Sequence, residues 1–533
     1  MSLKVVVGGS AASAVASQVP KLIEDKVASR IAAKDFTLWG KDAESESSIR
    51  LGWVTSAFDS EPLLDGIEAL RSEFAAKGVD RFVLCGMGGS SLAPEVITRT
   101  AGVELVVLDS TNADQVGHAL AGDLTRTAVV VSSKSGSTVE TDSQKRVFEA
   151  AFEAAGIDKR DRIVIVTDPG SPMEQAAKAD GYRIFNADPN VGGRYSALTA
   201  FGLVPSGLAG VNIRALLKDA QAAAEQLAGD DATNPALILG AALGATPGEY
   251  GMRDKIGIVT EDSPIVGFGD WAEQLIAEST GKLGRGVLPV VLTPNAAELH
   301  SGLADLLAVR LVSDATTVRG DEVAVSGSLG AQFVLWEYAT AIASRLIGIN
   351  PFDQPDVESA KIAARAMLTS REAIAPAAFS VDGIEVRAQQ FDLGGASSIQ
   401  AAIAALLKTL DTDSGYLSVQ AYLDRTSVGE AFELRDLAAN KSRRPVTFGW
   451  APRFLHSTGQ YHKGGPAQGV YLQIVSAAKQ DIDVPGRDFS FGELIASQAA
   501  GDAKVLAEHG RPVLTLTLAD AKAGIEVIKR ALA

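Results

Sequence analysis

Groups that bind anions are concentrated in the stretch Ser132-Ser-Lys-Ser-Gly-Ser-Thr138, which offers hydroxyls, backbone N–H groups and one ammonium. The stretch follows an apolar, β-branched run at 128–131 that predicts a buried strand, and it precedes a predicted helix at 139–154. Free N–H groups and the positive end of the helix dipole both favour an anion at such a helix N-terminus. The stretch therefore predicts a phosphate-binding loop.

A second Gly/Ser-rich turn, Gly86-Met-Gly-Gly-Ser-Ser91, lies upstream, again between a predicted strand (81–85) and a predicted helix. Two strand–loop–helix units in tandem place their loops at the same carboxyl edge of a parallel sheet. Each loop alone fits an ordinary turn about as well as a ligand site. Together they favour a sugar-phosphate ligand that is held from two sides.

Two other functions fit part of this pattern. Gly86 and Gly88, followed by Asp109 after the next predicted strand, match part of a dinucleotide fingerprint and support an NAD(P)-dependent oxidoreductase. Ser91 stands where the third glycine of that fingerprint is expected, and a dinucleotide leaves the second loop without a role. A non-catalytic sugar-phosphate sensor would need both loops but no catalytic groups.

The composition excludes several classes of partner. The 533 residues carry 49 Lys and Arg against 65 Asp and Glu, and this charge of −16 argues against nucleic acids and anionic membranes. One cysteine excludes an internal disulfide and fits a reducing cytoplasm, and the five histidines show no metal-ligand spacing. We expect no signal peptide, membrane span, metal or other cofactor.

The elements that position these loops alternate between strands and helices. Predicted strands at 82–85, 105–108, 128–131, 162–167 and 182–186 alternate with helices, which favours a doubly wound parallel sheet. A strand at 255–260 opens a second α/β region, and further α/β elements follow a linker that begins at 375. The predicted parts are a helical N-terminal segment, two α/β domains and a C-terminal α/β extension, at 1–60, 61–208, 209–374 and 375–533.

Five motifs make the sequence resemble the phosphoglucose isomerase family, which is built on sugar-isomerase domains. They occur in the family's order and span about half of the chain. The segment Leu455-His-Ser-Thr-Gly-Gln460 is in addition similar to the isomerase half of bifunctional transaldolase/phosphoglucose isomerases. The five motifs are Gly86-Met-Gly-Gly-Ser90, Ser133-Lys-Ser-Gly-Ser-Thr138, Gly192-Gly-Arg-Tyr-Ser196, Glu278-Ser-Thr-Gly-Lys282 and Asn350-Pro-Phe-Asp-Gln-Pro-Asp-Val-Glu-Ser-Ala-Lys361.

The resemblance implies an α/β fold with two doubly wound parallel-sheet sugar-isomerase domains, the second completed by strands from the C-terminal extension. It implies a cofactor-free isomerase of glycolysis and gluconeogenesis that interconverts glucose 6-phosphate and fructose 6-phosphate through an enediol. Glu278 would move the proton between C2 and C1, Arg194 would stabilise the enediolate, and His456 and Lys361 would open the ring. The residues expected to hold the phosphate are Gly89, Ser90, Ser133, Lys134, Ser135 and Thr138.

The sequence departs from the family at two places. Asp356 stands where the family usually has glycine. The family's histidine motif lies between the glutamate and lysine motifs, where this chain has only His300, in a run (302–311) that predicts an ordinary helix. His456 has the fuller motif, and we favour it as the ring-opening residue. The resemblance implies a homodimer, although the added tail could complete the site within one chain.

Overall fold

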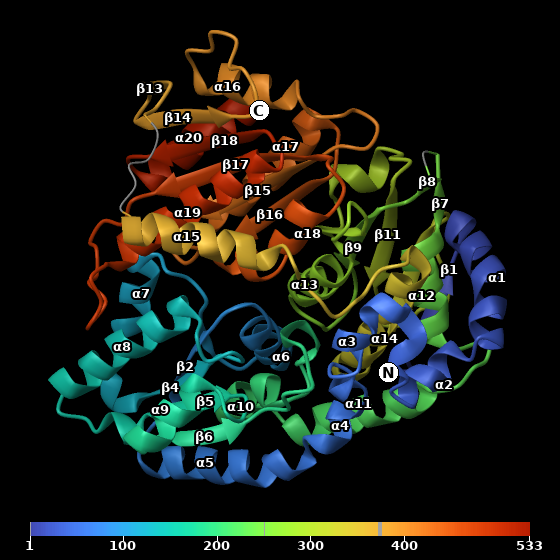
Figure 1. The fold of residues 1–533 in the computed structure, drawn as a ribbon, viewed down its shortest axis with the longest axis horizontal. Coiled ribbons are helices and arrows are strands. Elements are labelled where there is room, and N and C mark those ends of the chain that lie inside the picture. Colours follow the sequence, from blue (N-terminus) through green and yellow to red (C-terminus); the bar gives the residue numbers. More distant parts are fainter. Residues whose placement is uncertain (1, 250, 371–375) are drawn as a thin grey trace.

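The computed structural model describes residues 2–249, 251–370 and 376–533, except for the side chains of 357–361 and 369–370. Its strands form three main sheets, covered by helices (Figure 1). The predicted α/β class with parallel sheets is confirmed. No described helix is long and apolar enough to cross a membrane.

The first sheet has the strand order β3-β2-β4-β5-β6, and all its strands are parallel. Its central strand β4 reads as a continuous apolar run because both of its faces are covered by helices. The strands are β2 (Arg81–Gly86), β3 (Val106–Leu108), β4 (Thr127–Ser132), β5 (Ile163–Thr167) and β6 (Arg183–Asn186). The helices are α5 (Leu64–Ala76), α6 (Leu92–Ala101), α7 (Ala113–Leu120), α8 (Val139–Ala154), α9 (Pro172–Asp180) and α10 (Ala200–Ala209).

The second sheet has the order β1-β12-β11-β9-β10, and only its edge strand β1 is antiparallel. Two sequence-based predictions are wrong here. The N-terminal segment is not wholly helical, since β1 pairs with β12, and the predicted helix at 302–311 contains the strand β11. Both strands are short apolar runs, and periodicity does not distinguish such runs from buried helix. The strands are β1 (Lys4–Val7), β9 (Lys255–Thr260), β10 (Leu288–Leu292), β11 (Leu306–Leu311) and β12 (Glu322–Ser326), with a separate hairpin of β7 (Pro247–Gly248) and β8 (Gly251–Met252).

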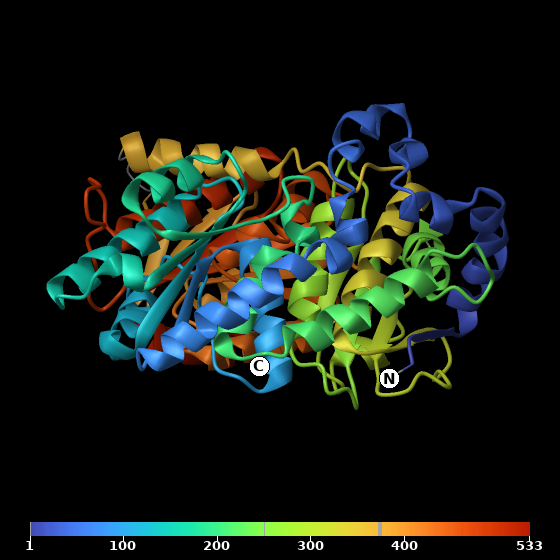
Figure 2. The ribbon, with the colours of Figure 1, turned by 90° about the horizontal axis from the view of Figure 1, so that it is seen from below.

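Helices from the N-terminal segment and from residues 213–347 surround the second sheet. Figure 2 shows the N-terminal helices (dark blue) at the end of the molecule that holds this sheet (yellow-green). One hydrophobic cluster runs from the first sheet to the second and includes Val130, Leu203 and Trp336. The helices of this region are α1 (Gly9–Glu24), α2 (Val27–Ala32), α3 (Glu44–Ser47), α4 (Ser56–Asp59), α11 (Ile213–Leu227), α12 (Pro235–Ala245), α13 (Phe268–Thr280) and α14 (Leu329–Ile347). The helix that follows, α15 (Val357–Ser370), packs against the C-terminal extension instead.

The C-terminal extension forms a sheet of its own, in the order β13-β14-β18-β17-β15-β16. We expected its strands to complete the second sheet, and that detail is wrong. It has a separate hydrophobic core between the sheet and α16, α17 and α20. The strands are β13 (Phe379–Val381), β14 (Ile384–Gln389), β15 (Tyr416–Tyr422), β16 (Val446–Trp450), β17 (Gly469–Ser476) and β18 (Val513–Leu518), and the helices are α16 (Ile399–Leu407), α17 (Glu433–Ser442), α18 (Gly459–Gly464), α19 (Phe491–Glu508) and α20 (Ala521–Leu532).

Candidate active site

The predicted phosphate loop joins β4 to α8. The hydroxyls of Ser133 and Thr138 lie 3.1 Å apart, and the N–H of Gly136 donates to Ser133 Oγ at 3.2 Å. Gly136 has φ +66°, and a Cβ there would lie 2.8 Å from the backbone nitrogen of Met173, so the turn requires glycine. The result is a compact turn, rich in hydroxyls, at the N-terminus of a 16-residue helix.

Lys134 already has an anionic partner in this loop. Its ammonium forms an ion pair with Asp168 and donates to the carbonyl of Pro189 at 3.4 Å. Burial lowers the pKa of Lys134, an effect that Asp168 opposes, and burial raises the pKa of Asp168. An anion bound in the loop would therefore share Lys134 with a carboxylate, which the sequence pattern did not predict.

The second glycine loop packs against two other motifs. A Cβ on Gly88 would lie 2.6 Å from the carbonyl oxygen of His456, and one on Gly89 would lie 2.0 Å from the carbonyl oxygen of Gly193. Only glycine allows this backbone-to-backbone approach. The loop, with buried Ser90 at its end, thus brings the arginine motif and the C-terminal histidine turn to the same sheet edge.

Arg194 and Glu278 meet in the interior. Arg194 lies in the turn η8 (Gly193–Tyr195) with 2% of its surface exposed, and its Nη1 is 3.2 Å from Glu278 Oε1. Nε donates to Ser279 Oγ at 2.8 Å, and Nη2 donates to the carbonyl of Pro351 at 2.6 Å. Glu278 lies in the last turn of α13. The arginine is thus held in one orientation beside the carboxylate.

The loop before α15 surrounds two buried cations with oxygen atoms. Lys282 Nζ donates to the carbonyls of Asn350 at 2.8 Å and Asp353 at 2.5 Å, and Arg194 Nη1 donates to Gln354 Oε1 at 2.6 Å. Burial and the nearby Arg194 lower the pKa of Lys282 to about 8, although Asp353 opposes them. The glutamate, arginine and lysine motifs are therefore joined by direct hydrogen bonds.

His456 lies in the turn η11 (Arg453–His456), which comes from the C-terminal extension. Its Nε2 is 2.9 Å from Glu140 Oε1, and the same oxygen accepts a hydrogen bond from Gln498 at 2.8 Å. The amide of Gln274 donates both to the carbonyl of His456 at 2.8 Å and to Glu278 Oε2 at 2.9 Å. A single glutamine thus links the histidine turn to the candidate base.

Glu140 was missed by the sequence analysis. It lies in the first turn of α8, directly after the phosphate loop, and it is buried. A buried carboxylate there was predictable only as a helix-dipole partner, since 316 positions separate it from His456. The structure shows it as the carboxylate that faces the histidine.

The structure distinguishes the two candidate histidines by their surroundings. His300 ends the short turn η9 (Ala297–His300) with its side chain exposed, whereas His456 lies at the junction of the motifs. The Lys361 side chain lies outside the described residues, although its backbone belongs to α15. Just before α15, Asp356 exchanges two hydrogen bonds with Gln460, at 2.9 and 2.7 Å, so the residue that departs from the family pattern contacts the histidine segment.

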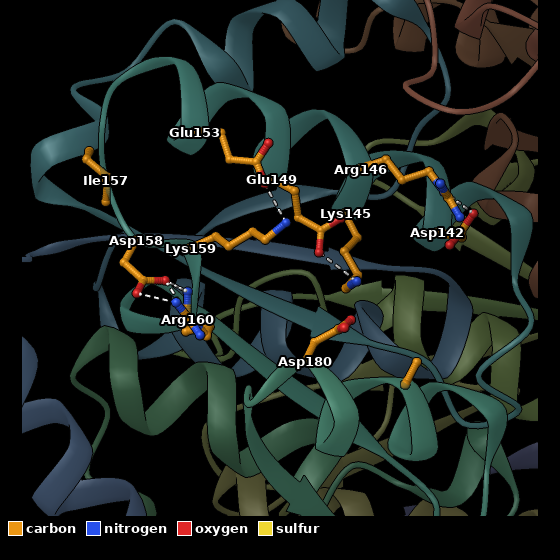
Figure 3. Close-up of a pocket in the computed structure, with 11 residues that line it drawn as sticks. Asp142, Lys145, Arg146, Glu149, Glu153, Ile157, Asp158, Lys159, Arg160 and Asp180 are labelled. Atoms are coloured by element: carbon orange, nitrogen blue, oxygen red, sulfur yellow. Dashed lines mark hydrogen bonds and ion pairs between the residues drawn. The ribbon is translucent and has the colours of Figure 1, made fainter.

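A groove on the outer surface of the first domain, of about 650 Å³, does not have the features of an anion site (Figure 3). It contains no residue of the five motifs. All four of its cations are paired with carboxylates: Arg146 with Asp142, Lys145 with Glu149, Lys159 with Glu153, and Arg160 with Asp158. Among the described residues, no group of three or more His, Cys, Asp and Glu could hold a metal ion.

Comparison with known proteins gives the family. The family model for phosphoglucose isomerase matches residues 65–286. The probable glucose-6-phosphate isomerase of Natronomonas pharaonis is 30% identical over 371 residues, which cover 60% of this chain and 85% of that protein. The chain belongs to the phosphoglucose isomerase family. The probable glucose-6-phosphate isomerase of Haloarcula marismortui is 33% identical over 47% of this chain, and the match spans only 56% of that relative's length.

Solved structures show the same fold. A hypothetical protein from Thermus thermophilus is 25% identical to this chain, with a TM-score of 0.57. The match covers 68% of this chain and 99% of that protein. A glucose-6-phosphate isomerase from Chlamydia trachomatis is similar in fold, with a TM-score of 0.51 at 18% identity over 66% of this chain and 79% of that one. These structures confirm the fold, and the family model together with the Natronomonas pharaonis relative confirms the recognition of the family from its motifs.

Proposed function

We propose that the protein is an isomerase that interconverts glucose 6-phosphate and fructose 6-phosphate. The observation that supports this most directly is the convergence of Glu278, Arg194 and the His456–Glu140 pair beside the Gly88 loop. Such an isomerisation needs a carboxylate base, a cation near the developing enediolate, and an acid–base group for the ring. The family membership agrees with all three requirements.

The proposed mechanism assigns one role to each group. The hydroxyls of Ser90, Ser133, Ser135 and Thr138, together with Gly89, hold the phosphate, and Lys134 contributes charge that it shares with Asp168. The His456 imidazole, held by Glu140, and the Lys361 amine move the ring-opening proton between O5 and O1. Glu278 takes the C2 proton and returns it to C1, while Arg194 stabilises the negative oxygens of the enediolate.

The structure weakens the dinucleotide hypothesis. The carboxylate of Asp109, which should accept hydrogen bonds from a ribose, is 2% exposed and lies 3.3 Å from Arg425 and 3.4 Å from Arg453. It is therefore not available to a cofactor. A sugar-phosphate sensor needs no buried Glu278–Arg194 pair and no His456–Glu140 pair, so both pairs favour an enzyme.

The C-terminal extension brings His456 to the candidate site from within the same chain. This placement favours a site that is complete within each copy, whether or not copies form a homodimer. We therefore expect the activity per chain to stay constant when the protein is diluted, even if a dimer dissociates on dilution. A substrate of central carbon metabolism also favours the cytoplasm as the location of the protein.

A coupled assay tests the proposed function. Fructose 6-phosphate is supplied, and the glucose 6-phosphate formed is oxidised by an added dehydrogenase whose NADPH is measured. We expect turnover by the wild-type protein and its loss in Glu278→Gln. Reduction of added NAD(P) without the coupling enzyme would instead support an oxidoreductase, and binding of sugar phosphate without turnover would support a sensor.

A further inference from the structure

Arg453 opens the same short turn that ends at His456, and it binds carboxylates from the two other domains. Its Nη1 is 2.7 Å from Glu95 in α6 and 3.4 Å from Asp109 after β3. Its Nη2 is 3.2 Å from Asp270 in α13. The Arg453 side chain is only 8% exposed and meets Glu95 and Asp109 inside the interface between the domains, whereas the Asp270 side chain is 41% exposed.

A second arginine shares two of these carboxylates. Arg425, which follows β15, lies 2.9 Å from Glu95 and 3.3 Å from Asp109. Burial by itself would raise the pKa of Glu95, but Arg453 and Arg425 hold it at about 2. The two arginines thus keep one buried carboxylate ionised, yet only Arg453 belongs to the histidine turn.

The turn is partly held by packing, since Phe454 belongs to a hydrophobic cluster with Tyr422 and Ala499. A cavity of about 400 Å³ lies next to the turn, and its lining includes Arg453 and Asp270 themselves. On the inner side the turn is in contact with Gly88 and with Gln274, which also binds Glu278. The ion pairs of Arg453 add direct contacts from the turn to α6 and α13.

We propose that Arg453 is a positioning residue that sets the place of His456 relative to Glu278 and the Gly88 loop. This inference rests on the proposed isomerase function. A guanidinium has a planar fork of donors and can bind two carboxylates at once in one geometry. Because α13 carries both Asp270 and Glu278, the Arg453 contact fixes the ring-opening group to the helix of the base. A displacement of about 1 Å at a catalytic group can cost on the order of 10²-fold in rate.

The test compares Arg453→Gln with the matched control Arg425→Gln, which removes a charge from the same carboxylates without altering the histidine turn. Two substrates are used for each variant. One is cyclic glucose 6-phosphate. The other is erythrose 4-phosphate, whose C4 oxygen carries the phosphate and cannot close a ring, and its C2 proton exchange with deuterated water is followed by NMR.

We expect Arg453→Gln to slow turnover of the cyclic substrate by about 10²-fold and to slow proton exchange from the open-chain substrate by less than about threefold. Arg425→Gln should lower the rates on both substrates slightly and by the same factor. We expect Arg453→Gln and Arg425→Gln both to lower the thermal stability of the protein. Arg453→Lys keeps the charge but loses the fork, so we expect an intermediate loss, confined to the cyclic substrate, at nearly wild-type stability.

Equal losses on both substrates in the Arg453 variants, or identical behaviour of the Arg453 and Arg425 variants, would overturn the positioning role. If Arg453→Gln does not fold, Arg453→Lys decides the question by the same ratio of the two rates. Absence of isomerisation by the wild-type protein would instead refute the proposed function, and the positioning role with it.

Discussion

The proposed phosphate loop and the proposed catalytic centre are built in different ways. The loop is contiguous, from Ser133 to Thr138, and the hydrogen bonds among its own hydroxyls and amides join residues at most five positions apart. The centre joins Arg194 to Ser279 across 85 positions, Gln274 to His456 across 182, and His456 to Glu140 across 316. Ligand binding should therefore depend on a local unit, whereas turnover should depend on how three domains meet.

Replacing the candidate base should have the largest effect. In Glu278→Gln the amide keeps the shape of the side chain and can still accept from Gln274, but it cannot take a proton. We expect turnover to fall by about 10²–10⁴-fold, with substrate affinity nearly unchanged. Exchange of the C2 proton with deuterated water measures the loss directly, and Glu273→Gln on the same helix is the control. Exchange at the wild-type rate in Glu278→Gln would place the base elsewhere.

The next largest effect concerns the two histidines. His456→Ala should slow isomerisation of cyclic substrate by about 10²-fold and that of an open-chain analogue much less, because only ring opening loses its acid–base group. His300→Ala should be close to neutral, since its side chain is exposed. Steady-state rates on both substrates measure the difference. If His300 proves essential and His456 dispensable, the C-terminal turn is structural and the centre lies elsewhere.

The phosphate loop should give a smaller effect, and one on binding. Removing the charge-assisted contacts in Ser133→Ala/Lys134→Ala should weaken glucose 6-phosphate and inorganic phosphate alike, by about tenfold, since such contacts contribute roughly 1.5–3 kcal/mol. The inhibition constant of inorganic phosphate measures the change.

The partner of Lys134 offers an opposite control. Asp168→Asn removes the carboxylate that competes for the ammonium, so phosphate should inhibit more strongly, by a few fold, with little change in the rate constant for turnover. Unchanged phosphate inhibition in both the double variant and Asp168→Asn would mean that the anion binds at a different loop.

Removing metal should have no effect. The proposed chemistry uses a carboxylate, an arginine, a histidine and a lysine, so activity in excess chelator should equal activity in untreated protein. The coupled assay measures this, with a control for any divalent ion that the coupling enzyme itself needs. If the chelator abolishes activity and a divalent ion restores it, the proposed metal-free mechanism is wrong.

The sequence-based predictions were accurate where structure depends on local residues and failed where it depends on distant ones. Strands of the first sheet were predicted nearly to the residue, because a strand buried on both faces has an unbroken apolar run, as β4 does. The prediction failed for β1 and β11, where short apolar runs carry no decisive period. The assignment of the C-terminal strands to the second sheet was also wrong, since they form a separate sheet and no local pattern specifies which sheet a strand joins.

By itself the sequence determined the family and the two Gly/Ser loops, and it singled out Arg194, Glu278 and His456 as candidates, because motif chemistry and strand–helix alternation depend on neighbours in the chain. Only the tertiary structure decided that Glu140 faces His456, that Asp168 shares Lys134, and that Arg453 ties the histidine turn to α6 and α13. Those contacts join residues 34 to 358 positions apart. The first pairs His456 of the C-terminal extension with Glu140 of the first domain, the second joins the loops after neighbouring strands β4 and β5, and the third joins different domains. No local pattern of residues specifies such pairings.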